Sequence, residues 1–359
     1  MRALASLLVA ATALSSPATI HQQSSYNEGS SVAAVGATFG LLDVLGPAAS
    51  ALTGLWKSLP EGYPLAFGDD ISTPALLSRE PREGYERWTV ASPAMGRTVG
   101  LDVIPGSGGP TVYLLEGVDS PETSNWITKG YLFPVFSEEN ATVVIPAQGA
   151  GSMWQDWESD DPVLGRNKWE TFLTQELPPL VEAAVSHNGK RAIIGLSMGA
   201  SGAVMLANKH PGFYAGVAGI SGCYSTMDQL GRGTVNLTVT NKGGSTTNMW
   251  GEFGSPAWRE NDVVSHPEGL RGSAVYLYSA NGAIDQAGLD NYTGRSLIDQ
   301  IGGSLLEAGS QQCTRNLSAA LDAAGIAHTT VYGSAGAHDW YAFGKQLSPA
   351  WAAIKPAVQ

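Results

Sequence analysis

Ser197 lies at the centre of the stretch with the clearest chemical signature, Gly195-Leu196-Ser197-Met198-Gly199. A β-rich run ends at this serine and an alanine-rich helical run follows directly, which is the strand-turn-helix context of a nucleophile elbow. Glycines at 195 and 199 remove side chains where the turn brings the strand and the helix together. We therefore predict that Ser197 is a nucleophile. The alternative is a turn whose small residues serve only close packing.

A serine nucleophile needs a general base, and His338 is the candidate. It lies in the glycine-rich segment Gly336-Ala337-His338-Asp339-Trp340, after the last predicted strand. The base occupies this place where the chain order is serine, acid, histidine. His266, in a loop-rich segment, is the alternative base, although a surface histidine is the simpler interpretation of it.

Two residues compete for the acid of a triad. Asp285 follows a predicted strand directly, which is the usual position, whereas Glu307 lies in a predicted helix 31 residues before His338 (338 − 307). Position alone favours Asp285. For the oxyanion we expect the backbone N–H groups of Met198 and of Val118, which lies in the loop after an earlier strand.

The elements around these residues alternate between short β-rich runs and longer amphipathic runs. This alternation predicts an α/β fold with a mostly parallel sheet covered by helices on both faces. The predicted strands are 87–91, 98–104, 111–115, 141–146, 191–196, 216–221, 274–279 and 328–332, and the predicted helices are 121–135, 168–185, 198–209, 296–324 and 340–354. Residues 228–273, rich in Gly, Thr and Asn, are expected to form an excursion over the carboxyl edge of the sheet.

The N-terminus divides into two expected segments. Residues 1–18 combine a short basic start, an apolar stretch and small residues, which predicts a signal peptide, with a buried N-terminal helix as the alternative. Residues 19–85 are expected to be an extension, partly disordered or lying over the main domain, and residues 86–355 the catalytic domain. No later run is apolar enough to span a membrane, so we expect an exported protein without a transmembrane span.

Charge and cysteine content exclude several classes of protein. The 359-residue chain carries a formal charge of −12 and no basic cluster, which argues against nucleic acid as a partner. Cys223 and Cys313 are the two cysteines, and in an oxidising compartment we expect a disulfide between them; two buried free thiols are the alternative. Neither cysteine belongs to a CxxC or Cys/His cluster, so no metal is expected.

Several of these stretches together resemble the mycolyltransferases of the antigen 85 type, in the esterase D group of α/β-hydrolases. The matching stretches are ASPAMGRTVGLDV (91–103), TVYLLEG (111–117), NKWETFLTQELP (167–178), IGLSMGASGA (194–203), NMWGEFGSPAWRENDV (248–263), YSANG (278–282) and GAHDWYAF (336–343). The resemblance implies an α/β-hydrolase fold. It also implies that the acid is a glutamate on a helix, which moves Glu307 ahead of Asp285.

The activity implied by the resemblance is acyl transfer between glycolipids at the cell envelope, without a cofactor. The serine would take a mycolyl group from trehalose monomycolate and pass it to a sugar hydroxyl. A secreted carboxylesterase that uses water, and a non-catalytic envelope-binding protein, are the alternatives. The oligomeric state is left open.

A sugar site is expected from four residues: Glu116, Asn125, Trp126 and Trp340. Indole faces stack on pyranose rings and carboxylates accept hydroxyl protons, although these tryptophans could equally belong to the core. The sequence departs from the family pattern at two positions of the adjacent loop. Glu116 replaces an aspartate and Asp119 replaces a nearby arginine, which would alter sugar binding.

Overall fold

The computed structural model describes residue 59, residues 62–68, residues 70–291 and residues 297–359. The predicted signal peptide and most of the predicted extension therefore lie outside the described residues. Within them, no helix has both the length and the hydropathy to cross a membrane.

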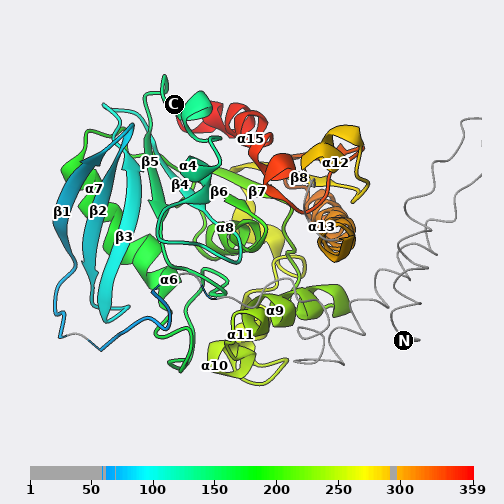
Figure 1. Ribbon diagram of the computed structural model, residues 1–359, viewed down its shortest axis with the longest axis horizontal. Coiled ribbons are helices and arrows are strands. Elements are labelled where there is room, and N and C mark those ends of the chain that lie inside the picture. The colour runs from blue at the N-terminus through cyan, green and yellow to red at the C-terminus, as the bar shows by residue number, and fades with distance from the viewer. Residues whose placement is uncertain (1–58, 60–61, 69, 292–296) are drawn as a thin grey trace, which may run out of the picture.

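A mixed nine-stranded sheet forms the centre of the fold, in the order β1-β2-β3-β5-β4-β6-β7-β8-β9 (Figure 1). The strands from β5 to β9 in this order run parallel, and β1, β2 and β3 pair antiparallel at one end. All eight predicted strands are present, so the predicted α/β class is confirmed. They are β2 (Tyr85–Ser92), β3 (Arg97–Ile104), β4 (Thr111–Leu115), β5 (Thr142–Pro146), β6 (Arg191–Leu196), β7 (Gly216–Ile220), β8 (Ala274–Ala280) and β9 (His328–Gly333).

Strand β1 (Ala75–Arg82) was not predicted, and it lies upstream of residue 86, where we placed the start of the catalytic domain. Its sequence, ALLSREPR, is mostly exposed and ends in charged residues and a proline. Such residues are typical of an edge strand, which they protect from pairing with another chain. They also hide the strand from a search for apolar alternation.

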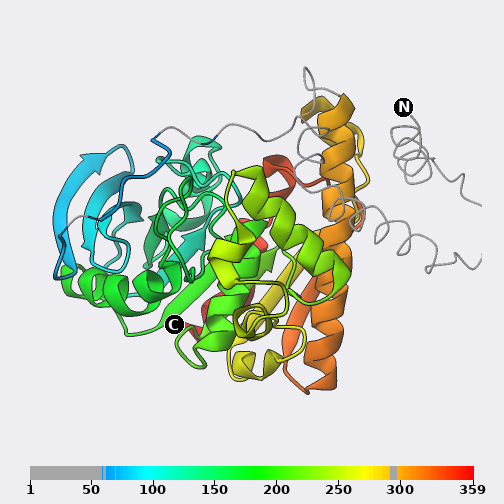
Figure 2. The ribbon, with the colours of Figure 1, turned by 90° about the horizontal axis from the view of Figure 1, so that it is seen from below.

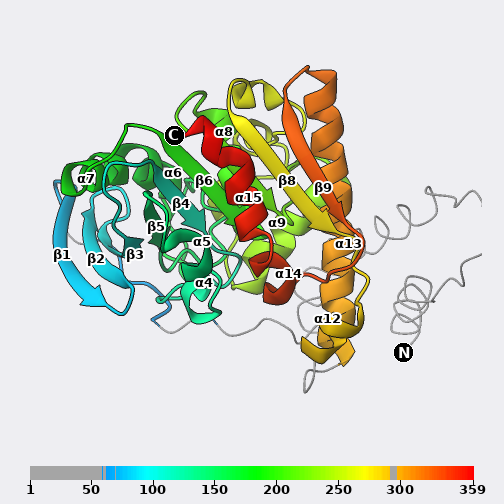
Figure 3. The same ribbon diagram turned by 90° about the horizontal axis from the view of Figure 1, so that it is seen from above.

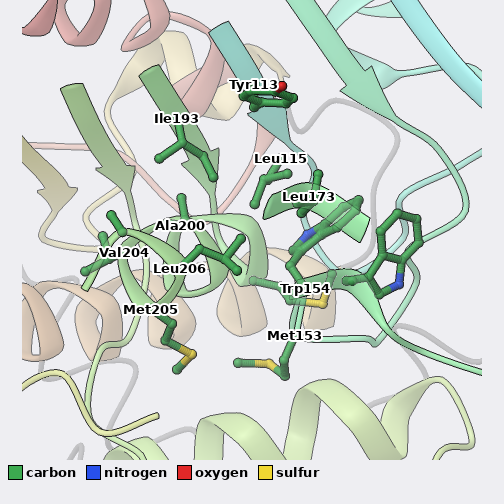
Figure 4. Close-up of a cluster of buried hydrophobic side chains, with 14 of the residues drawn as sticks. Tyr113, Leu115, Met153, Trp154, Leu173, Ile193, Ala200, Val204, Met205 and Leu206 are labelled. Carbon is green, nitrogen blue, oxygen red and sulfur yellow. The ribbon is translucent and has the colours of Figure 1, made fainter. Parts of the chain in front are cut away.

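Helices cover both faces of the sheet because alternate residues of its strands point to opposite sides. On one face, Tyr113, Leu115 and Ile193 pack toward Ala200 and Val204 of α8 (Met198–Lys209) (Figure 4). Figure 2 shows α8 together with α9 (Gln229–Asn241) on this side of the sheet. The same core takes in buried residues of α6 (Trp169–Thr171), the π-helix η1 (Phe172–Glu176), α7 (Leu177–Ala184), α10 (Thr246–Trp250), α11 (Pro256–Glu260), the 3-10 helix η2 (Pro267–Leu270) and α13 (Leu297–Ala323).

The opposite face carries a second core. Here Val112, Leu114 and Ile194 pack with residues of α4 (Asn125–Thr128), α5 (Phe133–Phe136), α14 (Trp340–Gly344) and α15 (Leu347–Ile354). Figure 3 looks onto this face, with α15 lying across the parallel strands. The chain also forms α12 (Gln286–Asn291) after β8 and ends near the 3-10 helix η3 (Lys355–Ala357).

In three segments the observed helices differ from those predicted from the sequence. Residues 121–135 form two short helices, α4 and α5, instead of one long helix, and residues 340–354 are divided into α14 and α15. The segment 228–273, expected to be an irregular excursion, contains α9, α10, α11 and η2. Tertiary packing overrides the weak helix propensity of its Gly, Thr and Val residues.

Candidate active site

Ser197 occupies the sharp turn between β6 and α8 with φ +53° and ψ −123°, a conformation that non-glycine residues rarely adopt. Glycines on either side permit the turn. A Cβ on Gly195 would lie 2.0 Å from the carbonyl oxygen of Gly199, and one on Gly199 would lie 2.4 Å from that of Leu115. The two glycines are therefore required sterically, and backbone strain is stored at the serine itself.

The Ser197 hydroxyl lies in a hydrogen-bonded chain with His338 and Glu307. Oγ of Ser197 is 2.7 Å from Nε2 of His338, and Nδ1 of His338 is 2.8 Å from Oε2 of Glu307. The Glu307 side chain is fully buried, and its Oε1 accepts hydrogen bonds from the Ser221 hydroxyl and the Ala280 N–H, both 2.7 Å. This arrangement can hold the histidine in one orientation and stabilise its positive charge after proton transfer.

The two alternative residues lie elsewhere. Asp285 is exposed and accepts a hydrogen bond from the Gly288 N–H at the start of α12. His266 is exposed at the residue preceding η2. The structure thus brings Ser197, Glu307 and His338 together and leaves Asp285 and His266 out of this chain of hydrogen bonds.

Two backbone N–H groups are available beside the serine. Met198 is the first residue of α8, where helical N–H groups have no partner within the helix. The loop that carries Val118 passes close by, since a Cβ on Gly117 would lie 3.8 Å from Oγ of Ser197. Among the described residues, neither N–H donates to a protein acceptor.

A cavity of about 50 Å³ opens beside Ser197. Ser197, His338, Val118 and Met198 all line it. The remaining wall comes mainly from two helices: Thr234, Leu237, Thr238 and Asn241 of α9, and Leu306 and Ser310 of α13. The predicted excursion therefore does lie over the site, although as a helix.

The wall from α9 is the part of the site that the sequence analysis missed. Asp228 was a usable signal for the start of this helix, because aspartate is a preferred N-cap residue. In the structure its side chain accepts a hydrogen bond of 2.6 Å from the Gly231 N–H. The thirteen residues that follow contain no proline. An N-cap before such a run is a helix-start signal, despite the unfavourable composition.

A disulfide joins Cys223 to Cys313, as predicted. Cys223 follows β7 and lines the cavity, whereas Cys313 lies on α13, six residues after Glu307 (313 − 307). Both residues are buried. The bond therefore ties the helix that carries Glu307 to the loop at the floor of the cavity.

Glu116 does not line this cavity. Its side chain is 1% exposed, and its Oε1 accepts hydrogen bonds from the Ser124 hydroxyl at 2.5 Å and the Asn125 N–H at 2.7 Å. Burial raises the pKa of this carboxyl to about 7. In the structure, Glu116 fastens the start of α4 to the end of β4.

The two tryptophans of the expected sugar site are in contact with each other. The indole rings of Trp126 and Trp340 lie edge to face, with centroids 5.1 Å apart. Trp126 is fully buried in the core, whereas Trp340 is partly exposed. Of these two indoles, only Trp340 presents a surface to solvent, and the sugar site of Glu116, Asn125, Trp126 and Trp340 stays a prediction.

The loop after β4 is also linked to α9. Asp119, whose side chain is 64% exposed, forms an ion pair with the buried ammonium of Lys242, which donates a hydrogen bond of 2.5 Å to its Oδ1. Lys242 is the C-terminal cap of α9. This pair joins the loop of Val118 to the helix that forms one wall of the cavity.

Clusters of three or more His, Cys, Asp or Glu side chains with the geometry of a metal site do not occur in the described part of the chain.

Comparison with known proteins identifies close sequence relatives. Residues 92–354 match the family model described as "Putative esterase". The diacylglycerol acyltransferase/mycolyltransferase Ag85B of Mycobacterium leprae is 31% identical over 327 residues, covering 86% of this chain and 92% of the relative. The diacylglycerol acyltransferase/mycolyltransferase Ag85C of Mycobacterium avium is 30% identical over 322 residues, and this match covers 87% of each of the two chains.

Solved structures agree with the fold. The crystal structure of Mycobacterium tuberculosis MPT51 (FbpC1) superposes with a TM-score of 0.65 at 28% identity, covering 77% of this chain and 99% of that one. An S-formylglutathione hydrolase from Agrobacterium tumefaciens reaches a TM-score of 0.60 at 18% identity, which supports the fold alone.

Proposed function

The chain belongs to the esterase family and, within it, to the antigen 85 mycolyltransferases, and from this membership we propose that it is an acyltransferase with Ser197 as its nucleophile. The observation that carries the proposal is the chain of hydrogen bonds from Ser197 through His338 to Glu307 beside a cavity. A hydroxyl in this arrangement can be deprotonated as it attacks an ester.

The reaction proceeds in two steps. Nε2 of His338 accepts the Ser197 proton as Oγ attacks the ester carbonyl, and the N–H groups of Val118 and Met198 bind the oxyanion. His338 then returns the proton to the departing alcohol, which leaves an acyl-serine. In the second step His338 accepts the proton of the acceptor hydroxyl as its oxygen attacks the acyl-serine, and it then gives that proton to Oγ of Ser197 as the new ester is released.

The Glu307 carboxylate acts on His338 and not on the substrate. It accepts the hydrogen bond from Nδ1 and stabilises the imidazolium formed in each step. Because Oε1 is held by Ser221 and the Ala280 N–H, the carboxylate enters the reaction already oriented.

For the substrates, the family membership supports a mycolyl or other long acyl chain taken from trehalose monomycolate, with a sugar hydroxyl of the cell envelope as acceptor. Trp340, two residues after His338 in the sequence, offers a partly exposed indole for a sugar ring. We place the enzyme outside the cytoplasmic membrane, where the Cys223–Cys313 disulfide would form and persist.

A second candidate is a carboxylesterase that transfers the acyl group to water, because the same hydrogen-bonded chain from Ser197 through His338 to Glu307 can activate a water molecule as the acceptor. The cavity of about 50 Å³ at Ser197 would leave the far end of a long acyl chain outside it. Transfer over hydrolysis depends on how completely the acceptor excludes water from the acyl-serine.

One incubation separates the candidates. The protein is mixed with trehalose monomycolate, and trehalose dimycolate is resolved from free mycolate by chromatography and mass spectrometry, with Ser197→Ala as control. Trehalose dimycolate formed by the wild type and not by Ser197→Ala supports the transferase. Free mycolate as the sole product would show that the protein is an esterase instead. If folded protein forms neither product, a non-catalytic binding role is favoured.

A further inference from the structure

A second cavity, of about 140 Å³, lies on the other flank of the loop that carries His338. Ala335, Gly336, Ala337 and Asp339 line it, whereas His338 lines the cavity at Ser197. The two cavities share no lining residue. The outer wall comes from α12 and the preceding residues, and the floor from β8 and α14.

Tyr278 provides an unpartnered polar group at the floor of this second cavity. Its side chain is 5% exposed, and its hydroxyl makes no hydrogen bond within the described part of the chain. Glycines leave room around the hydroxyl, since a Cβ on Gly333 would come within 2.5 Å of it and one on Gly336 within 3.9 Å. Burial, and next the nearby Glu307 charge, raise the pKa of Tyr278 to about 12, so the group remains a hydrogen-bond donor at neutral pH.

The walls add both acceptors and donors. Asp339 is 7% exposed, and its Oδ1 accepts from the Ala342 N–H while Oδ2 is left without a partner among the described residues. Asp285, on the opposite wall, contributes a second carboxylate. Lys345 and Gln346 supply an ammonium and an amide.

We propose that this second cavity binds a small neutral polyhydroxylated ligand, of the size of one pyranose ring. Hydroxyl groups donate to carboxylates and accept from ammonium, amide and tyrosine hydroxyl groups, so one ligand can satisfy this mixed set of partners. The Tyr278 hydroxyl has no partner among the described residues and faces the cavity, so a ligand hydroxyl can hydrogen-bond to it without displacing a protein group.

The size of the cavity supports a single ring. A protein cavity of about 150 Å³ accommodates benzene, a six-membered ring. The present cavity is of the same size, about 140 Å³, so it has room for the six atoms of one ring, while the hydroxyl groups of a sugar meet the polar side chains of the wall or extend through the open mouth. Tyr341 also lines the cavity, and the ammonium of Lys345 lies over its ring, 3.4 Å from the centroid, so one face of that ring is already occupied.

A metal ion fits this cavity less well than a neutral ligand. The described residues contain no cluster of three or more candidate ligands, and here the two carboxylates are accompanied by a lysine. The proposal does not depend on the acyltransferase activity, because it concerns binding at residues other than Ser197, Glu307 and His338.

The test uses the full-length protein labelled with ¹⁵N, titrated with glucose and, separately, with glycerol as an open-chain polyol. Glucose is expected to shift the amide signals of Gly288, Gly336 and Ala342 saturably, and glycerol to bind more weakly. Tyr278→Phe removes only the hydroxyl and is expected to weaken glucose binding by about tenfold. Ala335→Leu, which puts a larger side chain into the cavity, is expected to abolish it.

Tyr113→Phe is the matched control, because Tyr113 is also buried with an unpartnered hydroxyl but lies away from this cavity. It should bind glucose as the wild type does. The proposal is overturned if the three amides show no saturable shift up to about 100 mM glucose, a range that covers millimolar affinities. Undiminished binding by folded Tyr278→Phe would overturn it equally.

Discussion

Ser221 donates a hydrogen bond of 2.7 Å from its hydroxyl to Oε1 of Glu307. The other oxygen of the same carboxylate lies 2.8 Å from Nδ1 of His338, so Glu307 is held on both oxygens. Ser221 follows β7 directly, is 1% exposed and has a positive φ of 57°. A strained, buried serine thus positions the acid of the proposed triad.

Replacing Glu307 by Gln should lower kcat by about 10²- to 10⁴-fold, because the neutral amide cannot stabilise the imidazolium of His338. Asp285→Asn is the matched control and should change kcat less than about twofold, since Asp285 is exposed and caps α12. Hydrolysis of a chromogenic ester by both variants measures this. A larger loss in Asp285→Asn than in Glu307→Gln would reassign the acid.

Ser221→Ala should reduce kcat by about tenfold with little change in KM, because Glu307 loses one of its charge-assisted hydrogen bonds. Ser279→Ala is the control: Ser279 is equally buried, but its hydroxyl has no partner in the structure. Kinetics and melting curves of both variants are compared. If both variants lose activity alike, Ser221 has only a packing role.

Removing the disulfide with Cys223→Ala and Cys313→Ala together should lower both stability and kcat. The bond spans 90 residues, for which the chain-entropy argument gives up to about 4–5 kcal/mol in the free energy of unfolding. Activity should fall because α13, which carries Glu307, loses its tie to the cavity floor. An unchanged melting temperature and unchanged turnover would contradict this role.

Stability should depend on pH through Glu116. Its pKa of about 7 in the folded state is above the ordinary value of 4.5, so its contribution is complete below pH 4.5 and is lost as the pH rises through 7. The wild type should therefore lose about 3 kcal/mol more than Glu116→Gln between pH 4 and pH 8. Urea unfolding at several pH values measures the difference.

Glu122→Gln serves as the control for that series, since the Glu122 side chain is 64% exposed on the same loop. Its stability should follow the pH dependence of the wild type. Parallel curves for wild type and Glu116→Gln would show that the pKa of Glu116 is the same in the folded and unfolded states, which would contradict the prediction.

The parallel strands could be predicted from the sequence because they are short apolar runs, buried on both faces of the sheet. Strand β1 could not, since an exposed edge leaves charged residues in place of apolar ones. Helix α9 was hidden by its glycine, threonine and valine content, which packing against the core compensates.

The site was predicted unevenly for similar reasons. Ser197 and His338 followed from local motifs and chain order, whereas position alone favoured Asp285 over Glu307. Only the family resemblance pointed to Glu307, because no local pattern indicates which residue of a 27-residue helix will reach His338 across the fold. The Asp228 N-cap could have indicated helix α9, but its place as a wall of the site, like the cavity at Tyr278, arises from long-range packing and has no local signature.

The central claim is that Ser197 carries the acyl group between donor and acceptor. Mass spectrometry of the protein quenched during turnover of an ester tests it directly. The account predicts an acyl adduct on the peptide that contains Ser197. The adduct should be absent from Ser197→Ala. In a variant that lacks His338, it should form only as far as Ser197 still attacks the ester without its general base. Steady turnover with an adduct on another residue, or undiminished turnover by Ser197→Ala, would contradict it.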